Sequence, residues 1–135
     1  MVRATLVDSN VLLDILTEDD EWFDWSADRL SDEASNGALL INPIIYAEVS
    51  AGFERIEDVD EALPLSFCRR VPLPWDAAFL AGQCFVKYRR RGGARRSPMP
   101  DFYIGAHAAV AGLTLLTRDA RRYRAYFPPL RIIAP

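Results

Sequence analysis

The chain has 135 residues, half of them apolar and 26% charged, a composition typical of one globular domain. No apolar run approaches the roughly 20 residues that a membrane-spanning helix needs, and Asp8 comes too early for the apolar core of a signal peptide. Cys68 and Cys84 lack C-x-x-C spacing, so we expect reduced thiols in a cytoplasmic protein rather than a disulfide or a zinc site.

The net charge of −3 conceals an uneven distribution of charge along the chain. Residues 1–64 hold 16 acidic and 3 basic residues, whereas residues 65–135 hold 3 acidic and 13 basic residues. The two halves could neutralise each other in the folded protein, or the second half could offer a basic surface to a polyanion beside an acidic site. Both interpretations can hold at once.

Strand and helix patterns alternate through the first half of the chain. Strands are expected at residues 4–7 and 39–41, and helices over residues 11–16, 20–35, 43–53 and 57–63. Asn42 is predicted to cap the third helix, because its side chain can accept a backbone hydrogen bond and Pro43 suits the first helical position. The second helix is expected to bury one stripe of residues, namely Phe23, Ala27, Leu30 and Ala34.

The alternation continues through the second half. Strands are expected at residues 68–71, 114–116 and 130–133, and helices over residues 76–88, 100–112 and 120–126. The helix that begins at Asp76 is expected to end in a loop rich in glycine and arginine. Its predicted buried face consists of Ala78, Phe79, Gly82, Phe85 and Val86. The alternating elements predict an α/β fold with a mainly parallel sheet in a single domain, residues 1–135.

Four acidic residues follow or adjoin the predicted strands. Asp8 and Asp119 come after apolar strands, Asp101 opens a helix, and Glu48 lies on the helix after the second strand. Acids at the carboxyl ends of parallel strands point into one crevice. Gathered carboxylates repel each other and need a cation, and hard oxygen ligands favour Mg²⁺ or Mn²⁺. Singly, each acid could be a helix cap or a solvated residue, but together they suit metal-assisted hydrolysis of a phosphodiester.

Other catalytic arrangements are not indicated. The only histidine, His107, lies within an alanine-rich helix, so we expect it to pack or to form a hydrogen bond rather than to act as a general base. The pair Gly92-Gly93 follows a helix and does not fit a phosphate-binding Walker loop.

Four segments together resemble the PIN domain, and within it the VapC-like toxins of bacterial type II toxin–antitoxin modules. They occur in the family's order across nearly the whole chain: DSNVLLD at 8–14, PIIYAEV at 43–49, PDFYIGAHA at 100–108 and LLTRD at 115–119. The resemblance implies a three-layer α/β/α sandwich and a metal-dependent endoribonuclease that inhibits growth by cleaving RNA. It maps the family's acids onto Asp8, Glu48, Asp101 and Asp119, and supporting polar positions onto Asn10 and Thr117.

The resemblance also implies a homodimer and a cognate antitoxin whose C-terminal segment fills the groove. We hypothesise that Trp22 and Trp25 contact this antitoxin, because they lie off the expected buried stripe among acidic neighbours. The alternative is that a wide apolar face buries both in the core. Arginines are expected to hold RNA phosphates: Arg89, Arg90, Arg91, Arg95, Arg96, Arg118, Arg121 and Arg122.

Rival functions make demands that the sequence does not meet. A receiver domain needs a lysine at the end of a late strand, but the only lysine is Lys87, in a helical pattern. A phosphatase of the haloacid dehalogenase type needs a D-x-D signature, and here the pattern is Asp8-Ser-Asn10. The alternatives that stay open are a PIN-like RNA-processing nuclease without an antitoxin and a catalytically silent RNA-binding module.

Overall fold

The computed structural model describes residues 3–93 and 98–135, so the arginines expected at 95 and 96 lie outside the described residues. Within this part of the chain, one sheet contains five strands: β1 (Arg3–Val7), β2 (Gly37–Ile41), β3 (Arg69–Arg70), β4 (Thr114–Leu116) and β5 (Ile132–Ile133). The described helices are α1 (Ser9–Leu16), α2 (Phe23–Asn36), α3 (Pro43–Ser50), α4 (Ile56–Ala62), α5 (Trp75–Arg90), α6 (Met99–Ala111) and α7 (Arg121–Tyr126). No helix of the described residues is long and apolar enough to cross a membrane.

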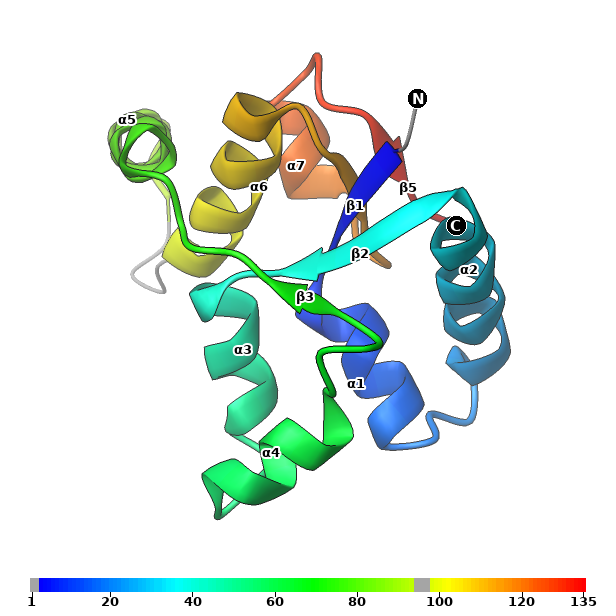
Figure 1. Cartoon of the computed structure of the whole chain (residues 1–135). Helices are drawn as coiled ribbons and strands as arrows, with labels where there is room; N and C mark the ends of the chain where they lie inside the picture. The colour runs from blue at the N-terminus through cyan, green and yellow to red at the C-terminus, as the bar shows by residue number, and fades with distance from the viewer. Residues whose placement is uncertain (1–2, 94–97) are drawn as a thin grey trace.

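The sheet has the strand order β3-β2-β1-β4-β5, and neighbouring strands are parallel. The chain moves outwards from β1 to β3, then returns to β4 on the other side of β1 and continues to β5. Because parallel crossovers are right-handed, this reversal places the two sets of helices on opposite faces. Figure 1 shows α1–α4 on one side of the sheet and α5–α7 on the other. The predicted three-layer α/β/α sandwich with a parallel sheet is confirmed.

The reversal between β1 and β4 creates the place where a site can form. Val7 is in register with Leu116, so the two central strands end level with each other. The backbone N–H of Asp8 then donates to the carbonyl of Leu116 over 2.9 Å. Ligands of open parallel sheets bind beyond the carboxyl ends of strands at such a switch point. The segments after β1 and β4 therefore lie side by side at the sheet edge that binds ligands.

Several local predictions are confirmed. Asn42 caps α3, since its Oδ1 atom accepts from the N–H of Ile45 over 2.9 Å, and Pro43 occupies the first turn. Cys68 and Cys84 are free and buried. His107 is buried, and its Nδ1 atom lies 3.0 Å from Nδ2 of Asn42, so it is a hydrogen-bonding residue as expected.

The prediction for the buried face of α2 is correct only in part: Leu30 is buried, but Phe23 and Ala27 are only half-buried. The helix buries Ser26, Leu30 and Glu33, whereas Ala34 is exposed. Two of the buried residues are polar, and each has a partner that compensates for lost water. Ser26 donates to Asp14 Oδ2 over 2.7 Å, and Glu33 Oε1 accepts from the Thr5 hydroxyl over 3.1 Å and from Arg3 Nη2 over 3.0 Å.

The prediction for the buried face of α5 is wrong. The helix buries the small side chains of Ala77, Ala81 and Cys84, and it packs extensively against α6. Phe79 is 71% exposed and Trp75 is 90% exposed. Small side chains allow two helix axes to approach closely, because the separation of packed helices depends on the side chains at their contact. α5 therefore has a second, outward apolar stripe, formed by Trp75, Phe79, Gly82 and Val86.

Candidate active site

Three of the four predicted acids line one cleft of about 380 Å³ beyond β1 and β4. They are Asp8, Asp101 and Asp119, and they come from the end of β1, the first turn of α6 and the segment after β4. The remaining lining residues are Asn10, Tyr88, Arg121, Arg122, Tyr123, Ala125 and Tyr126. The fourth acid, Glu48 of α3, is joined to this group by Ser9, whose hydroxyl donates to Glu48 Oε1 over 2.9 Å. The fold therefore brings Asp8 close to Asp119, although the two are more than 100 positions apart in sequence.

Asp8 is the buried centre of the group. Its Oδ1 atom accepts from the N–H of Ser9 over 2.8 Å, so it also caps α1. Its Oδ2 atom accepts from the hydroxyls of Thr117, over 2.8 Å, and Tyr123, over 2.9 Å. Burial raises the pKa of the Asp8 carboxyl above its ordinary value against the lowering effect of these hydrogen bonds, and the charge of Asp101 raises it further.

Thr117 and Asn10, the predicted supporting residues, hold the segment after β4 against the start of α1. The Thr117 hydroxyl accepts from Asn10 Nδ2 over 3.3 Å and from the N–H of Asp119 over 3.2 Å. Asn10 Oδ1 accepts from the N–H of Arg118 over 3.1 Å. Asp119 is exposed, and its Oδ1 atom lies 3.4 Å from the N–H of Arg121. These bonds set the position of Asp119 relative to Asp8.

Asp101 is held by two residues of α7. Its Oδ2 atom accepts from Arg122 Nη1 over 2.7 Å, and its Oδ1 atom lies 3.4 Å from the Tyr123 hydroxyl. Burial raises the pKa of Tyr123 well above its ordinary value, and the neighbouring carboxylates raise it further, so this phenol stays a neutral donor. Sequence reasoning missed Tyr123, because an aromatic residue on a short helix is usually part of the core. The available signal is its position four residues after Asp119.

The carboxylates influence one another across the cleft. Burial raises the pKa of Glu48 above its ordinary value, and the charges of Asp8 and Asp101 raise it further. Such mutual repulsion is what a cation would relieve, and carboxylate and hydroxyl oxygens are the donors that Mg²⁺ and Mn²⁺ prefer. The donor chemistry therefore fits a hard divalent ion. Among the described residues, however, no three Asp, Glu, His or Cys side chains already form a metal-binding group, and hydroxyls and Arg122 satisfy the acids instead.

The predicted RNA-binding arginines fall into distinct groups. Arg121 and Arg122 line the cleft, and Arg91 stacks over the ring of Tyr126, another lining residue, at 5.2 Å. Arg89 and Arg90 are exposed in the last turn of α5. Arg118 is engaged internally: its Nε atom donates to Asp14 Oδ2 over 2.9 Å, and its guanidinium lies 5.3 Å from the ring centre of Trp22. The cleft thus has basic residues along one rim.

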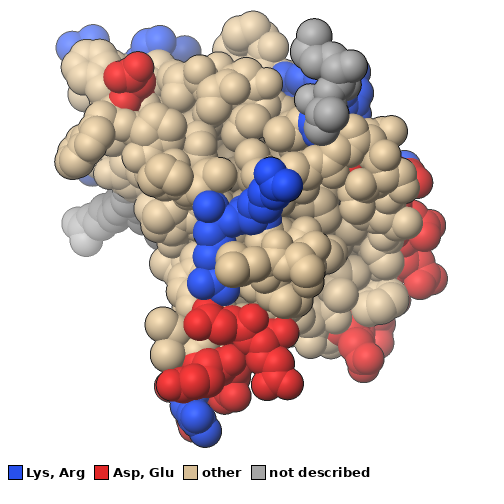
Figure 2. Space-filling view, in the orientation of Figure 1, with Lys and Arg blue, Asp and Glu red and all other residues tan. Residues whose placement is uncertain are grey.

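Trp22 and Trp25, the predicted partner contacts, pack edge to face with ring centres 6.1 Å apart. Both are half-buried, and Trp25 packs against the core. Figure 2 shows acidic side chains gathered over α4 and along α2, and a basic patch over β3 that borders the acidic group of α4. The tryptophans therefore keep part of their surface exposed, and their neighbours in sequence are acidic.

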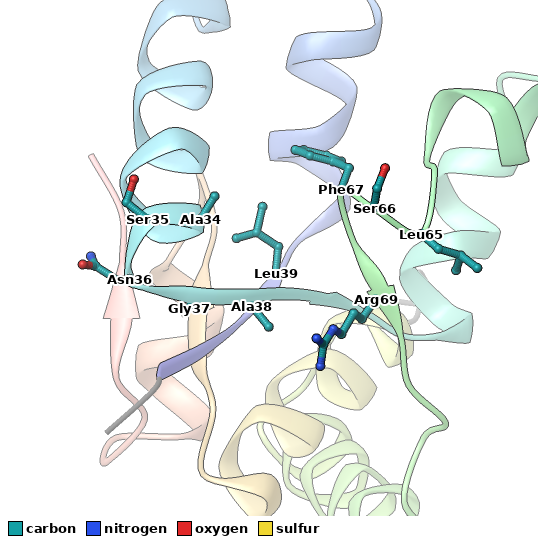
Figure 3. A pocket seen from close by; sticks show the side chains of 10 residues that line it. All are labelled: Ala34, Ser35, Asn36, Gly37, Ala38, Leu39, Leu65, Ser66, Phe67 and Arg69. Atoms are coloured by element: carbon teal, nitrogen blue, oxygen red, sulfur yellow. The ribbon is translucent and has the colours of Figure 1, made fainter.

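A second hollow, of about 520 Å³, lies near the amino ends of β2 and β3 (Figure 3). Side chains from the end of α2, the start of β2 and the segment before β3 surround it in the figure. Its lining consists of Ala34, Ser35, Asn36, Gly37, Ala38, Leu39, Leu65, Ser66, Phe67 and Arg69. None of these is a carboxylate, and none is a predicted site residue. The chemistry that the sequence predicts is therefore located in the cleft of Asp8.

The sequence matches one family model over most of its length. The family model described as "PIN domain" matches residues 5–128. The chain belongs to the PIN domain family. Comparison with curated proteins finds no significant match in sequence. The resemblance drawn from the four sequence segments is thus confirmed at the level of the family.

Chains of several solved structures share this architecture. A chain of the VapBC2 complex of Rickettsia felis has a TM-score of 0.75 at 18% identity, covering 98% of each chain. A chain of DNA-bound VapBC from Salmonella typhimurium has a TM-score of 0.68 at 22% identity, covering 99% of this chain and 98% of the other. A chain of FitAcB from Neisseria gonorrhoeae has a TM-score of 0.66 at 22% identity, covering 96% of each. These similarities establish the fold over nearly the whole length.

Proposed function

We propose that this PIN domain is a metal-dependent endoribonuclease that acts in the cytoplasm as the toxin of a toxin–antitoxin pair. The observation that carries the proposal is the convergence of Asp8, Asp101 and Asp119 on one cleft, with Glu48 attached through Ser9. The raised pKa values of Asp8 and Glu48 mark a concentration of negative charge that suits a cation. The similar folds of chains in VapBC and FitAcB complexes support the assignment to a toxin.

Mg²⁺ or Mn²⁺ would be held by Asp8, Asp101, Asp119 and Glu48. When bound, such an ion lowers the pKa of a water nucleophile and stabilises charge on the phosphate and the leaving oxygen. The protein's own part is to orient the ligands. Thr117 fixes Asp8 through its hydroxyl, and Asn10 fixes Thr117.

The arginines around the cleft would bind the RNA backbone. Arg91, Arg121 and Arg122 lie at the cleft, and Arg89 and Arg90 extend the basic surface along α5. Binding of phosphates releases counterions, so affinity falls as salt rises, with a slope that scales with the number of contacts. Replacing Arg89, Arg90 and Arg91 by Ala should weaken RNA binding and flatten this slope. Arg55→Ala is the control, because that guanidinium pairs with Glu57 beside α4.

An antitoxin is the proposed partner at Trp22 and Trp25. Aromatic anchors inside a polar rim are typical of residues that dominate an interface. The acidic rim here consists of Asp20, Glu21, Asp24 and Asp28. Trp22→Ala and Trp25→Ala should each weaken binding of the protein encoded just upstream by about 1–3 kcal/mol. Val110→Ala, which changes an exposed apolar residue of α6 on the opposite layer, should not.

A homodimer is proposed through the outward stripe of α5. A two-fold axis brings the same surface of two copies together, and Gly82 has open space around it, so two helices could approach closely. In an antiparallel arrangement, Asp76 in the first turn of one copy would face Arg90 in the last turn of the other. Phe79→Glu should therefore yield a monomer in sedimentation equilibrium. Val110→Glu, which changes an exposed apolar residue outside the stripe, should leave the dimer intact.

Cleavage of RNA by purified protein tests the nuclease itself. Asp8→Asn and Asp101→Asn should each abolish Mg²⁺- or Mn²⁺-dependent cleavage and relieve growth inhibition, while Asp32→Asn, on the surface of α2, keeps both. Full cleavage in EDTA, or by either cleft variant, would refute the metal mechanism. RNA binding without cleavage would indicate the silent RNA-binding module. Cleavage that no adjacent gene product neutralises would indicate an RNA-processing nuclease.

A further inference from the structure

Tyr123 reaches two of the acids in the cleft, and these belong to different elements. Its hydroxyl oxygen lies 2.9 Å from Oδ2 of Asp8, at the end of β1, and 3.4 Å from Oδ1 of Asp101, in α6. A phenol has one proton to donate. The two distances indicate a three-centre hydrogen bond, in which Asp8 is the main acceptor of this proton and Asp101 the weaker one.

A slot in α6 at Gly105 receives the ring of Phe127 and, beside it, the ring of Tyr123. Tyr123 is buried, and Gly105 leaves the space that its ring occupies. A Cβ atom at Gly105 would overlap Cε2 of Phe127 and would lie 3.0 Å from Cδ1 of Tyr123, both closer than ordinary contact allows. Gly105 and Asp101 are one turn apart on the same helix. The ring of Tyr123 therefore packs against α6 within one turn of Asp101.

The contacts of Asp8 show what the phenol adds. Ser9 and Thr117 bind the Asp8 carboxylate from the two segments that extend β1 and β4. Neither of them contacts the carboxylate of Asp101. Tyr123 does so, and it thereby links the buried acid to the half-exposed one across the cleft. Arg122, the other contact of Asp101, is exposed and comes from the solvent side.

We propose that Tyr123 is a positioning residue, which holds the carboxylates of Asp8 and Asp101 in the mutual orientation that receives a divalent cation. The inference rests on the metal site of the proposed function. Donors that orient metal ligands change metal affinity by about 10–100-fold when they are removed. Tyr123 touches neither water nor RNA in this role, because it acts through the two acids.

Binding of Mn²⁺ in the absence of RNA tests the inference, with free Mn²⁺ measured by electron paramagnetic resonance. Tyr123→Phe keeps the ring that packs against α6 and removes the hydroxyl, and it should weaken Mn²⁺ binding by about 10–100-fold. Tyr46→Phe is the matched control. It removes another phenol that donates to a carboxylate over 2.9 Å, that of Asp60, on the exposed surface of α3 and α4. The control should bind Mn²⁺ as the wild type does.

The outcomes separate this inference from the proposed function. If the wild type binds Mn²⁺ and Tyr123→Phe binds it equally well, Tyr123 does not position the ligands, and the metal site stands. If the wild type and Asp8→Asn bind Mn²⁺ alike, the metal site itself is refuted. The free energy of unfolding in urea is measured for the same variants. If Tyr46→Phe and Tyr123→Phe both lose stability, and both lose Mn²⁺ affinity in proportion to that loss, the role of Tyr123 is structural and the inference is refuted.

Discussion

Removing one partner of the ion pair between Arg118 and Asp14 should destabilise the protein strongly, because this pair joins the acidic first half of the chain to the basic second half and one of its charges is buried. The Asp14 side chain is 2% exposed and that of Arg118 is 31% exposed, with Nε and Oδ2 2.9 Å apart. In Arg118→Ala, the Asp14 carboxylate would keep its hydrogen bond from the Ser26 hydroxyl. A buried carboxylate would then lack its counterion.

The size of the effect follows from this burial. Removing one partner of a buried ion pair costs about 3–5 kcal/mol. Water can reach nearly a third of Arg118, so the cost should fall to about 2–3 kcal/mol. Lost contact with the ring of Trp22 adds about 0.5–1 kcal/mol. For a domain of this size each kcal/mol lowers the melting temperature by about 4 °C, so a decrease of about 10–15 °C is expected.

Urea unfolding monitored by tryptophan fluorescence and by circular dichroism measures this loss. Arg124→Ala, which changes an exposed arginine of α7, should alter the free energy of unfolding by less than about 0.5 kcal/mol. In the double variant Asp14→Asn/Arg118→Ala the buried charge is absent, so part of the lost stability should return. A loss in Arg118→Ala no larger than that of the control, with no recovery in the double variant, would refute the reasoning.

Three further outcomes are expected. Gly37→Ala should destabilise the protein by about 3 kcal/mol or more in urea unfolding, because its Cβ atom would overlap the backbone carbonyl oxygen of Arg3 and force β1 and β2 apart. Burial raises the pKa of the Cys68 thiol to about 12, so this thiol should resist iodoacetamide at pH 8 until the protein unfolds, and rapid native alkylation would contradict its burial. Metal binds carboxylates in their ionised form, and the pKa values of Asp8 and Glu48 are raised. As the pH is lowered, Mn²⁺ affinity should therefore begin to fall at a higher pH than it would with ordinary carboxylates. A Mn²⁺ affinity that does not change between pH 7 and pH 5 would contradict this.

Local signals and chain order allowed the site acids to be predicted. Asp8 and Asp119 follow short apolar runs, and because helices alternate with these runs, the pattern predicts strands of a parallel sheet. The carboxyl ends of parallel strands lie at the same edge of a sheet. The start of α3 was predictable for a similar reason, because the preferences of Asn42 and Pro43 act within one turn of helix.

The faces of α2 and α5 were not predictable in this way. Helical periodicity identifies residues that share a face, but it does not show which face meets the core. In α5 the large apolar residues at 75, 79 and 86 point outwards, because the small face that includes Ala81 fits closely on α6. In α2 the polar residue Glu33 is buried, because Thr5 and Arg3 supply its partners.

The sequence by itself therefore determined the α/β class, the order of the elements and the acids that meet at the edge of the sheet. Only the tertiary structure decided that Tyr123 bridges Asp8 and Asp101, and that Arg118 pairs with Asp14. The physical reason is distance along the chain. A hydrogen bond between residues about a hundred positions apart depends on side-chain packing at a single place, and no periodic or local pattern in the sequence encodes it.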